Sequence, residues 1–510
     1  MAAQAPITVG NAPLRIEDVV DVAAGRRQVA LDPASRERIQ AGAAYLKGLL
    51  DSGTEVYGVT TGYGDSCTVT IPGPLVAELP THLTRYHGCG LGRILEEGET
   101  RAVLVARLNS LAQGFSGVRW ELLEGLEGLV NRGVLPRIPA EGSVGASGDL
   151  TPLSYVAATL IGEREVTFQG RVRPASEALE EAGLKPLTLA PKEGLALMNG
   201  TAAMTGLACL AYDRAEYLDR LCGRITSLAV ASLRGNRDHF HPRLFQLKPH
   251  AGPQQCAGRI YGDLGGAQEE GAVRLQDRYS IRCAPHVIGV LSDALTWVRR
   301  DVENELNSAN DNPLVDPELG LLLHGGHFYG GHIAFAMDAL KTAVANLSDL
   351  MDRQLALLVD SRYNNGLPQN LSGSQGFRAP INHGLKAVQI AVSAWTAEAL
   401  KLTMPASVFS RSTECHNQDK VSMGTIAARD CLRVLELTEQ VAAALTLATL
   451  QALRLRDRQG EFATARLSPE ARGFLASFEA LPFLDEDVAL DTTLLGLVAS
   501  IRNQEWSIYP

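Results

Sequence analysis

The sequence predicts a mostly α-helical protein, with a long central helical bundle and a smaller, mixed N-terminal lobe. Beyond about residue 280, apolar side chains recur at spacings of three and four over long stretches, which is the rhythm of a buried helix face. Before about residue 200, glycine and proline clusters separate short apolar runs by loops. We therefore expect two domains, an N-terminal lobe over residues 1–200 and a bundle over residues 201–510.

Four segments carry the helical rhythm most clearly. They are the stretch after Pro285 (apolar face Val287, Leu291, Val298 and Val302), residues 333–360 (ended by Asn364-Asn365-Gly366), residues 384–400 and residues 427–456. At a rise of ~1.5 Å per residue the last would be about 45 Å long. Helices of this length separated by loops indicate a bundle, and they favour an oligomer in which helices run through more than one subunit's core.

The overall composition limits the possible partners. The chain has 510 residues, of which 45% are hydrophobic, and a formal net charge of −10. An acidic balance disfavours nucleic acid and anionic membranes, although one local arginine could still bind a small anionic substrate. No signal peptide is expected, Val441–Leu450 is too short to span a bilayer, and the eight cysteines contain no CxxC pair, so we expect a cytoplasmic protein with free thiols.

The run from Gly142 to Pro152, GSVGASGDLTP, is the most informative stretch of the sequence. It lacks the Gly-Lys-Ser/Thr of a phosphate-binding loop and the Gly-x-Ser-x-Gly of a nucleophile elbow. A plain turn before a helix fits it well, with Asp149 or Thr151 as the N-cap and Pro152 near the start.

A chemical interpretation of the same run is also open. The amide nitrogen of Gly148 could attack the carbonyl of Ala146, because small residues and a glycine allow the sharp bend that ring closure needs. Loss of two waters, one of them from the Ser147 side chain, would leave 4-methylideneimidazole-5-one. This ring is an electron-poor alkene, a stronger electrophile than any encoded side chain.

This run resembles the signature of the aromatic amino acid lyase family, which holds histidine, phenylalanine and tyrosine ammonia-lyases and related aminomutases. Other matching runs, in the family's order, are Tyr57–Gly64, Leu197–Thr201, Gln276–Cys283, Asn310–Pro313, Gly325–Phe328 and His416–Gly424. Together they cover most of the chain. The resemblance implies a mostly α-helical homotetramer with active sites shared between subunits. It also implies a 4-methylideneimidazole-5-one formed autocatalytically from Ala146, Ser147 and Gly148, with no metal or diffusible cofactor.

The reaction of this family must remove a weakly acidic β-proton and release ammonia from an amino acid. The electrophile would help by bonding to the amine or to the ring, and the sequence leaves both routes open. The resemblance implies that Tyr57 is the catalytic base. An unperturbed tyrosine has a pKa of ~10, so Tyr57 needs a nearby positive charge or helix N-terminus to act near neutrality.

Substrate-binding roles follow from the same resemblance. Arg282 is expected to bind the substrate carboxylate, because a guanidinium offers two parallel hydrogen bonds. Asn199, Gln276 and Tyr279 match positions that hold the cofactor ring or the carboxylate, and uncharged donors suit a developing oxyanion. The remaining expected contacts are Asn310 with the carboxylate, Phe328 with the cofactor and Asp65 with the substrate amine.

Three residues bear on the choice of substrate. His87 falls where the family places a side chain near the end of the substrate ring, with Tyr86 beside it, and could hydrogen-bond a phenol or an imidazole. Gln418 stands where the histidine-specific branch carries a glutamate. Because a site built for a hydroxyl rejects an analogue without it, we expect L-tyrosine as substrate and L-phenylalanine as a secondary one, giving p-coumarate or cinnamate and ammonia.

Several alternatives remain open. The same site could serve a tyrosine or phenylalanine 2,3-aminomutase, a histidine ammonia-lyase, or a binding protein that has lost catalysis. His327 replaces the asparagine of the family's usual Gly-Gly-Asn-Phe, which could change the surroundings of the cofactor or the contact with the substrate amine. His324, His327 and His332, like His239 and His241, raise the question of a metal, but no acidic or thiol ligand has matching spacing, and we expect none.

Overall fold

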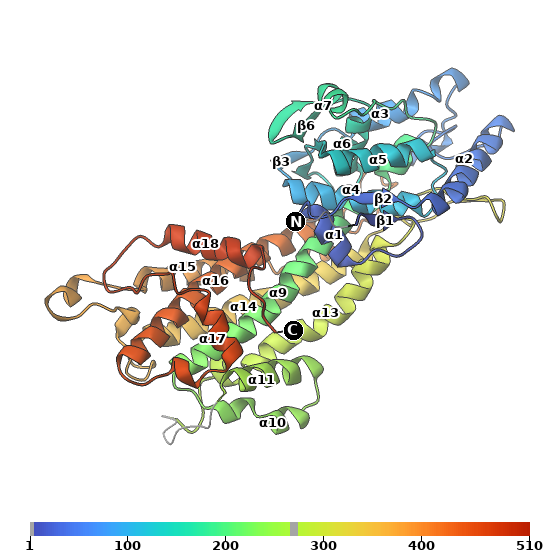
Figure 1. The fold of residues 1–510 in the computed structure, drawn as a ribbon. Helices are drawn as coiled ribbons and strands as arrows, with labels where there is room; N and C mark the ends of the chain where they lie inside the picture. The colour runs from blue at the N-terminus through green and yellow to red at the C-terminus, as the bar shows by residue number, and fades with distance from the viewer. Residues whose placement is uncertain (1–4, 266–273, 510) are drawn as a thin grey trace. The chain divides into compact units, whose positions relative to one another are not determined.

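The computed structural model describes residues 5–265 and 274–509, and the described chain is mostly helical with a few short strands (Figure 1). Its contacts define two compact units that interleave along the sequence. Unit 1 comprises Met1–Asp213, Val298–Asp338 and Pro405–Arg429, and unit 2 comprises Arg214–Trp297, Ala339–Met404 and Asp430–Pro510. The helical fold class is confirmed, whereas a division into functional lobes at residue 200 stays a prediction.

Unit 1 combines helices with small, separate sheets. Its helices are α1 (Ile16–Ala23), α2 (Arg36–Asp51), α3 (Leu79–Tyr86), α4 (Glu97–Ala112), α5 (Trp120–Arg132), α6 (Leu150–Leu160), α7 (Ala175–Glu181) and α8 (Glu193–Met198). Its strands are β1 (Ile7–Val9), β2 (Val29–Leu31), β3 (Leu91–Ile94), β4 (Leu135–Pro136), β5 (Pro139–Glu141), β6 (Glu165–Phe168), β7 (Arg171–Pro174), β8 (Leu314–Asp316) and β9 (Leu321–Leu323). Strands β1 and β2 pair in parallel, and β3–β5, β4–β6–β7 and β8–β9 are antiparallel.

The core of unit 1 is built around α4. Every residue of this helix from Ala102 to Ala112 is buried, as expected of a helix with neighbours on all sides. It packs against α1 and α5, and its buried polar residues reach the loops that form the site described below.

The long helices of the second half appear where the apolar spacing predicts them. They are α13 (Ala284–Leu306), α14 (Gly331–Val359), α15 (Lys386–Lys401) and α16 (Gly424–Arg458). A fifth long helix, α9 (Ala202–Ser232), was not predicted. It is buried on nearly all sides, as α16 is, so it lacks the exposed face that α13, α14 and α15 show.

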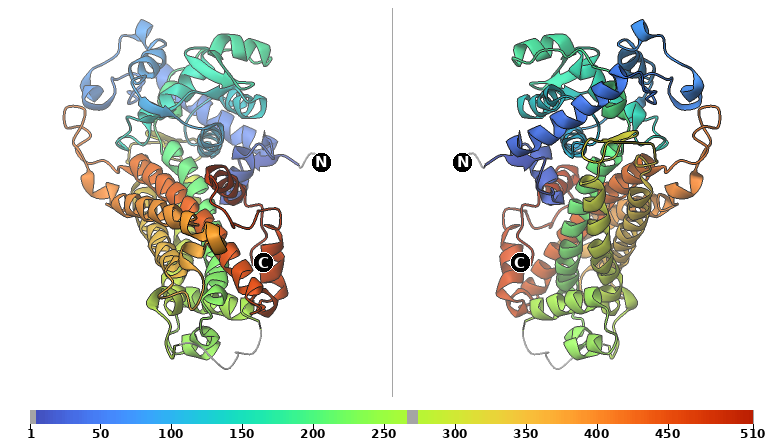
Figure 2. Two further views of the ribbon diagram at one scale, coloured as in Figure 1. Left: turned by 90° about the vertical axis from the view of Figure 1, so that its left-hand side faces the viewer. Right: turned by 90° about the vertical axis from the view of Figure 1, so that its right-hand side faces the viewer.

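Unit 2 holds the larger parts of these long helices, which run side by side in Figures 1 and 2. Its shorter helices are α10 (Pro242–Gln246), α11 (Ala251–Asp263), α12 (Tyr279–Arg282), α17 (Pro469–Ala476) and α18 (Asp491–Arg502). Buried polar contacts set the pairing of the helices. Glu439 of α16 accepts hydrogen bonds from Arg214 of α9 at 2.7 and 2.9 Å and from Arg502 of α18 at 2.9 Å. No helix in the described ranges is both long and apolar enough to cross a membrane.

Two helical glycines of unit 1 offer a test of this packing. An added Cβ at Gly48 in α2 would meet nothing within 4 Å, whereas one at Gly206 in α9 would lie 2.7 Å from the backbone of Ala102 in α4. We predict that Gly48→Ala raises the free energy of unfolding by about 0.5–1 kcal/mol, because alanine is the better helix former. Gly206→Ala should lower it by about 1–3 kcal/mol through overpacking. Urea unfolding midpoints check both, and equal shifts for the two variants would contradict the packing described.

Candidate active site

Unit 1 contains a cavity of about 870 Å³ whose lining comes from well-separated parts of the chain. This volume lies in the range of small-molecule sites. The residues that sequence analysis singled out and that line the cavity are Tyr57, Tyr86, His87, Ala146, Ser147, Asn199, Phe328 and Gln418. The fold therefore brings together most of the predicted site without reference to any ligand.

The Ala146-Ser147-Gly148 loop is sharply bent and pinned to the backbone of Gly200. Ser147 and Gly148 both have positive φ, at 49° and 77°. The N–H of Gly200 donates to the Ser147 carbonyl at 3.1 Å, and the Gly200 carbonyl accepts the N–H of Asp149 at 2.8 Å. A Cβ on Gly148 would lie 2.1 Å from that carbonyl oxygen, so only glycine fits. A bent tripeptide of small residues is what closure to the five-membered ring requires, and these residues fit it.

The Asp149 side chain holds this loop in place through hydrogen bonds to three segments. Its buried carboxylate accepts hydrogen bonds from the Thr425 hydroxyl, from the Ser143 hydroxyl at 3.2 Å and from the N–H of Met204 at 2.9 Å. Asp149 stands at the N-cap position of α6, but its side chain makes no cap hydrogen bond. Its carboxylate thus ties three segments together instead of capping the helix. Burial outweighs these donors and raises the pKa of Asp149 to about 6.

Tyr57 lines the cavity with its hydroxyl hydrogen-bonded to the backbone. The N–H of Gly64 donates to this oxygen at 2.8 Å. Burial raises the pKa of Tyr57, the Gly64 N–H acts against that rise, and the charges of Glu414 and Cys67 add to it. The net direction is upward, opposite to what a base at neutral pH needs. Among the described residues, none of the groups that shift this pKa is a cation, whereas the predicted role of Tyr57 calls for a nearby positive charge or helix N-terminus.

His87 follows α3 and sits beside Tyr86, with ring centroids 4.3 Å apart. Its Nδ1 lies 3.0 Å from the Leu83 carbonyl oxygen, an acceptor, so Nδ1 carries the proton. Burial lowers the pKa of His87 and favours the neutral ring. In that tautomer Nε2 is an acceptor, which suits a substrate group that donates, such as a phenol.

Two amide side chains complete the polar lining. The Asn199 amide donates to the Asn312 carbonyl at 2.9 Å, while its buried Oδ1 has no hydrogen-bond partner. The Gln418 Oε1 accepts the Thr413 hydroxyl at 2.8 Å, which leaves its NH₂ as the group able to donate to a ligand. Both side chains thus have hydrogen-bonding capacity in reserve for a ligand.

Two buried cations support the floor of the site. Arg107 of α4 donates to the carbonyls of Asn310 and Ala196 at 3.1 and 2.5 Å, and burial lowers its pKa to about 10. The ammonium of Lys192 lies 2.5 Å from the carboxylate of Asp311, with both side chains fully buried. Removing one member of such a pair leaves an uncompensated charge, so the pair fixes the segments on which Asn199 and Asn312 lie.

Six predicted residues do not line the cavity, and one of them, Gly148, belongs to the bent loop described above. Asp65 is exposed, and only its N–H makes a described contact, with Glu414. Asn310 is buried, and its amide bonds with Ser110 and Glu305. The other three, Gln276, Tyr279 and Arg282, belong to unit 2. There the Arg282 guanidinium lies 4.7 Å from the centre of the Tyr279 ring, and that ring is 72% exposed.

Glu414 is one of the cavity residues that sequence analysis did not single out. Its two carboxylate oxygens accept the N–H of Asp65 at 2.9 and 3.1 Å. Glu414, Cys415 and His416 all have positive φ, at 51°, 54° and 66°. For non-glycine residues this costs roughly 1–2 kcal/mol each, and such strain gathers at functional sites. No motif spacing could have revealed it, because the contact joins residues far apart in the chain.

Two histidines of the glycine-rich loop, His324 and His327, line different cavities. His324 lines the main cavity, its ring centroid 6.4 Å from that of Tyr57. His327 instead lines a smaller cavity of about 460 Å³, together with Glu305. No group of three or more His, Cys, Asp or Glu side chains suited to a metal occurs within residues 5–265 and 274–509.

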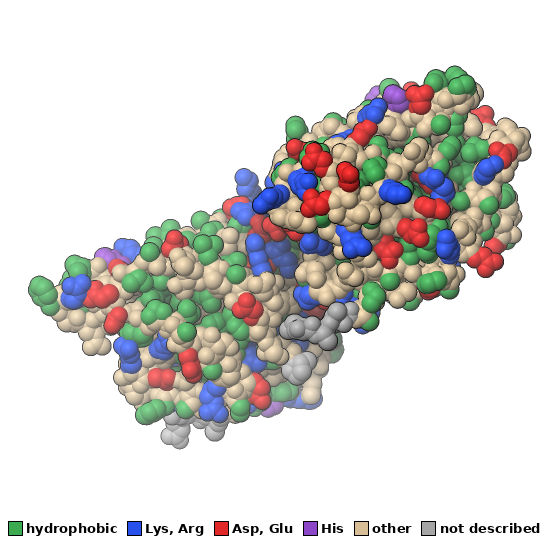
Figure 3. All heavy atoms as spheres, turned by 45° about the horizontal axis from the view of Figure 1, so that its top comes forward, with side chains coloured by type: hydrophobic (Ala, Val, Ile, Leu, Met, Phe, Trp, Pro, Cys, Tyr) green, Lys and Arg blue, Asp and Glu red, His purple; other side chains and the backbone are tan. Residues whose placement is uncertain are grey.

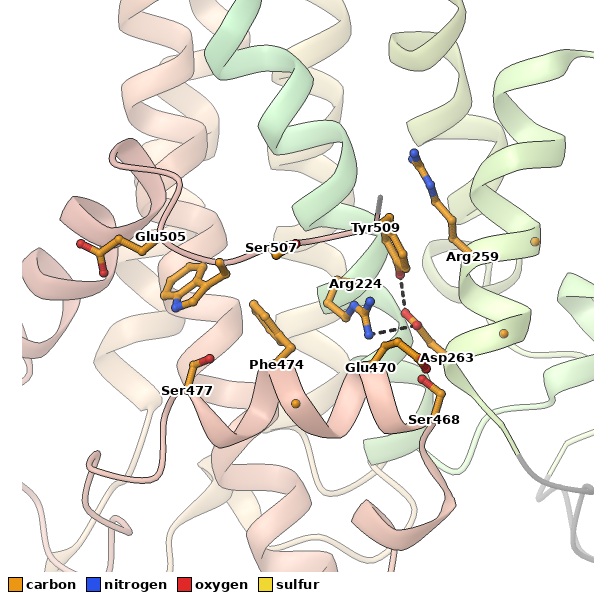
Figure 4. A pocket seen from close by; sticks show the side chains of 14 residues that line it. Arg224, Arg259, Asp263, Ser468, Glu470, Phe474, Ser477, Glu505, Ser507 and Tyr509 are labelled. Atoms are coloured by element: carbon orange, nitrogen blue, oxygen red, sulfur yellow. Dashed lines mark hydrogen bonds and ion pairs between the residues drawn. The ribbon is translucent and has the colours of Figure 1, made fainter. Parts of the chain in front are cut away.

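Unit 2 has a cavity of its own, of about 630 Å³, which contains none of the predicted residues (Figure 4). Arg224 and Tyr509 both point at Asp263, which lies 3.0 Å from the guanidinium and accepts the Tyr509 hydroxyl. Its buried charges are paired within the wall, so this cavity anchors the C-terminal tail. On the face in Figure 3, acidic and basic side chains are interspersed over the described residues, with no broad patch of one sign.

Comparisons with known proteins identify the family of this chain. Residues 14–480 match the family described as aromatic amino acid lyase. The chain is 38% identical to the histidine ammonia-lyase of Gloeobacter violaceus over 94% of its own length and 93% of that protein's. It is 38% identical to the tyrosine 2,3-aminomutase of Chondromyces crocatus over 86% of each chain. The crystal structure of the tyrosine aminomutase of Streptomyces globisporus superposes with a TM-score of 0.91, at 34% identity, over 98% of this chain and 97% of that one.

The raised pKa of Asp149 predicts how stability depends on pH. Because the folded protein holds this proton more tightly than the unfolded chain, the stabilisation is present at low pH and is lost as the pH rises from about 4 to about 6. The loss amounts to about 3 kcal/mol for a shift of about two pKa units. Unfolding free energies of wild type and Asp149→Asn, measured by urea from pH 4.5 to 7.5, should diverge over this range. Parallel curves would contradict the prediction.

Proposed function

This chain belongs to the aromatic amino acid lyase family and is similar to histidine ammonia-lyases, which are carbon–nitrogen lyases. We propose that it eliminates ammonia from L-tyrosine and secondarily from L-phenylalanine. The products are trans-p-coumarate or cinnamate, and ammonia. The observation that carries this proposal is the cavity of unit 1, in which the Ala146-Ser147 loop, Tyr57 and His87 meet.

The electrophile is 4-methylideneimidazole-5-one, formed autocatalytically from Ala146, Ser147 and Gly148. The bend of this loop and the close contact of Gly148 with Gly200 support its closure. Once formed, the group supplies an electron-poor alkene that activates the substrate for elimination. The side chain of Asn199, with its unpartnered Oδ1, is placed to hold the ring or the substrate carboxylate.

Tyr57 acts as the phenolate, which the Gly64 N–H at 2.8 Å stabilises, and becomes the neutral phenol when its oxygen takes the β-proton. The positive charge that lowers the tyrosine pKa comes with Arg282, which also binds the substrate carboxylate. Arg282, Gln276 and Tyr279 reach the cavity from another copy of the chain, in a homotetramer with shared active sites. The high exposure of Tyr279, and of Val290 and Ile390 on the long helices at 58% and 62%, supports this assembly.

The neutral His87 gives the ring end of the cavity its preference. Its Nε2 accepts a hydrogen bond from the phenol of tyrosine, and the Gln418 NH₂ adds a donor. Phenylalanine binds the same space without that hydrogen bond, so it is the poorer substrate. All eight cysteines are free thiols, which fits a reducing, cytoplasmic compartment.

A tyrosine 2,3-aminomutase is the second candidate. It is favoured by the aminomutases of Chondromyces crocatus and Streptomyces globisporus, to which this chain is similar over most of its length. Such an enzyme returns ammonia to the β-carbon before the arylacrylate leaves. The same residues serve both reactions, and the residence time of the arylacrylate decides between them.

An ultraviolet time course with L-tyrosine, L-phenylalanine and L-histidine, each added separately, tests this proposal. We expect the p-coumarate band to grow with tyrosine, cinnamate to form more slowly with phenylalanine, and histidine to give little urocanate. Ser147→Ala should reduce the rate by at least about 10³-fold, because it removes the source of the electrophile. A β-tyrosine assay of the same mixtures separates lyase from aminomutase.

The variant His87→Phe tests the proposed preference for tyrosine over phenylalanine. Loss of the ring-end acceptor should lower the tyrosine-to-phenylalanine ratio of kcat/KM by about 10²-fold or more. Histidine turnover comparable to that of tyrosine would refute the substrate assignment, and equal activity of Ser147→Ala would refute the cofactor.

A further inference from the structure

We propose that Glu414 is a positioning residue for Tyr57: its carboxylate holds the backbone at Gly64 and Asp65 so that the Gly64 N–H stays on the tyrosine hydroxyl. This inference rests on the proposed function, in which Tyr57 is the base. It assigns a role to a residue that no motif of the sequence singles out.

The contacts form a short, continuous chain from Glu414 to the base. Both carboxylate oxygens of Glu414 accept the N–H of Asp65, at 2.9 and 3.1 Å. The preceding N–H, that of Gly64, donates to the Tyr57 hydroxyl at 2.8 Å. Adjacent amides are covalently linked, so a carboxylate that fixes one of them also fixes the direction of the other.

The Glu414 carboxylate lies directly against the backbone of Gly64, in space that a side chain at this position would fill. A Cβ at this position would stand 2.3 Å from one Glu414 oxygen and 2.4 Å from the other. Gly64 also has a φ of +58°, which side chains rarely adopt. The glycine therefore serves both the turn and the close approach of Glu414.

The loop that carries Glu414 is built to present it. Thr413 and Gln418 exchange backbone hydrogen bonds at 3.0 and 3.2 Å, which close a small hairpin around the left-handed residues Glu414, Cys415 and His416. The strain lies in the turn and is held by the hairpin's base, so the carboxylate is offered from a fixed frame. Gln418, in the same hairpin, faces the same cavity.

Glu414 has two opposed effects on Tyr57, which substitution can separate. Its negative charge raises the pKa of Tyr57, whereas the N–H that it positions lowers it. Glutamine keeps an acceptor for Asp65 and removes the charge, while alanine removes both. The other titratable groups around Tyr57 are Tyr63, Cys67, Tyr86 and His324, with Lys420 also in the cavity lining.

The test compares Glu414→Gln and Glu414→Ala with wild type in the full-length enzyme. Glu398→Gln, which removes an exposed carboxylate paired with Arg433 in unit 2, is the control. The measurements are the pH dependence of kcat and KM with L-tyrosine, and hydrogen–deuterium exchange of the peptide spanning residues 58–66.

For Glu414→Gln we expect the acidic limb of the kcat/KM profile to move down by about half a pH unit, with the plateau preserved. For Glu414→Ala we expect kcat to fall by about tenfold or more while KM changes less than threefold, because the base is misplaced and binding is not. Exchange at Gly64 and Asp65 should become at least about tenfold faster in the alanine variant. The control should match wild type in every respect.

Wild-type exchange in Glu414→Ala, or a pH profile unchanged in both variants, would overturn the role of Glu414. The exchange measurement does not depend on turnover. If wild type acts on no aromatic amino acid, the proposed function fails while the exchange result still decides whether Glu414 holds this backbone.

Discussion

The site depends on one backbone contact, that between Gly148 and Gly200. Two hydrogen bonds of Gly200 hold this bend: its N–H donates to the Ser147 carbonyl, and its carbonyl accepts the N–H of Asp149. Neither position has room for a side chain, because a Cβ on Gly148 would meet the Gly200 carbonyl and a Cβ on Gly200 would meet the Arg107 guanidinium and the Asn310 carbonyl. The same contact sets Asn199, the neighbour of Gly200, beside Ser147 in the cavity. A backbone bent and held in this way, with positive φ at Ser147 and Gly148, suits the ring closure proposed for this loop.

Burial and the charges within unit 1 raise the pKa of Tyr57, whereas the proposed reaction needs it lowered. Unit 1 supplies the bent loop, the proposed base Tyr57 and the neutral His87, but burial and the charge of Glu414 leave the pKa of Tyr57 raised. A cation beside Tyr57 would reverse this direction. Arg282 of a neighbouring copy would meet that need and bind the substrate carboxylate in the same step. In the proposed assembly, a site shared between subunits would couple activation of the proposed base to occupation by substrate.

Much of the fold and part of the site could be predicted from the sequence, for different reasons. Helices with one exposed face, such as α14 and α15, can be predicted from apolar spacing, whereas α9, buried on nearly all sides, cannot. Tyr57 and Ser147 could be predicted as site residues because each lies inside a matched motif, and both line the same cavity. Asn310 lies in a matched run too, yet its side chain faces Ser110 and Glu305. The contact of Glu414 with Asp65 could not be predicted, because it depends on tertiary structure and on a strained turn.

The most direct test of this account is the mass of the purified protein, measured intact and on the peptide that contains Ala146-Ser147-Gly148. The account predicts that wild type is lighter than its sequence by two waters, that the loss maps to this peptide, and that Ser147→Ala has its full sequence mass. A wild-type protein at full sequence mass would contradict the self-made electrophile and leave the cavity of unit 1 without its central chemistry.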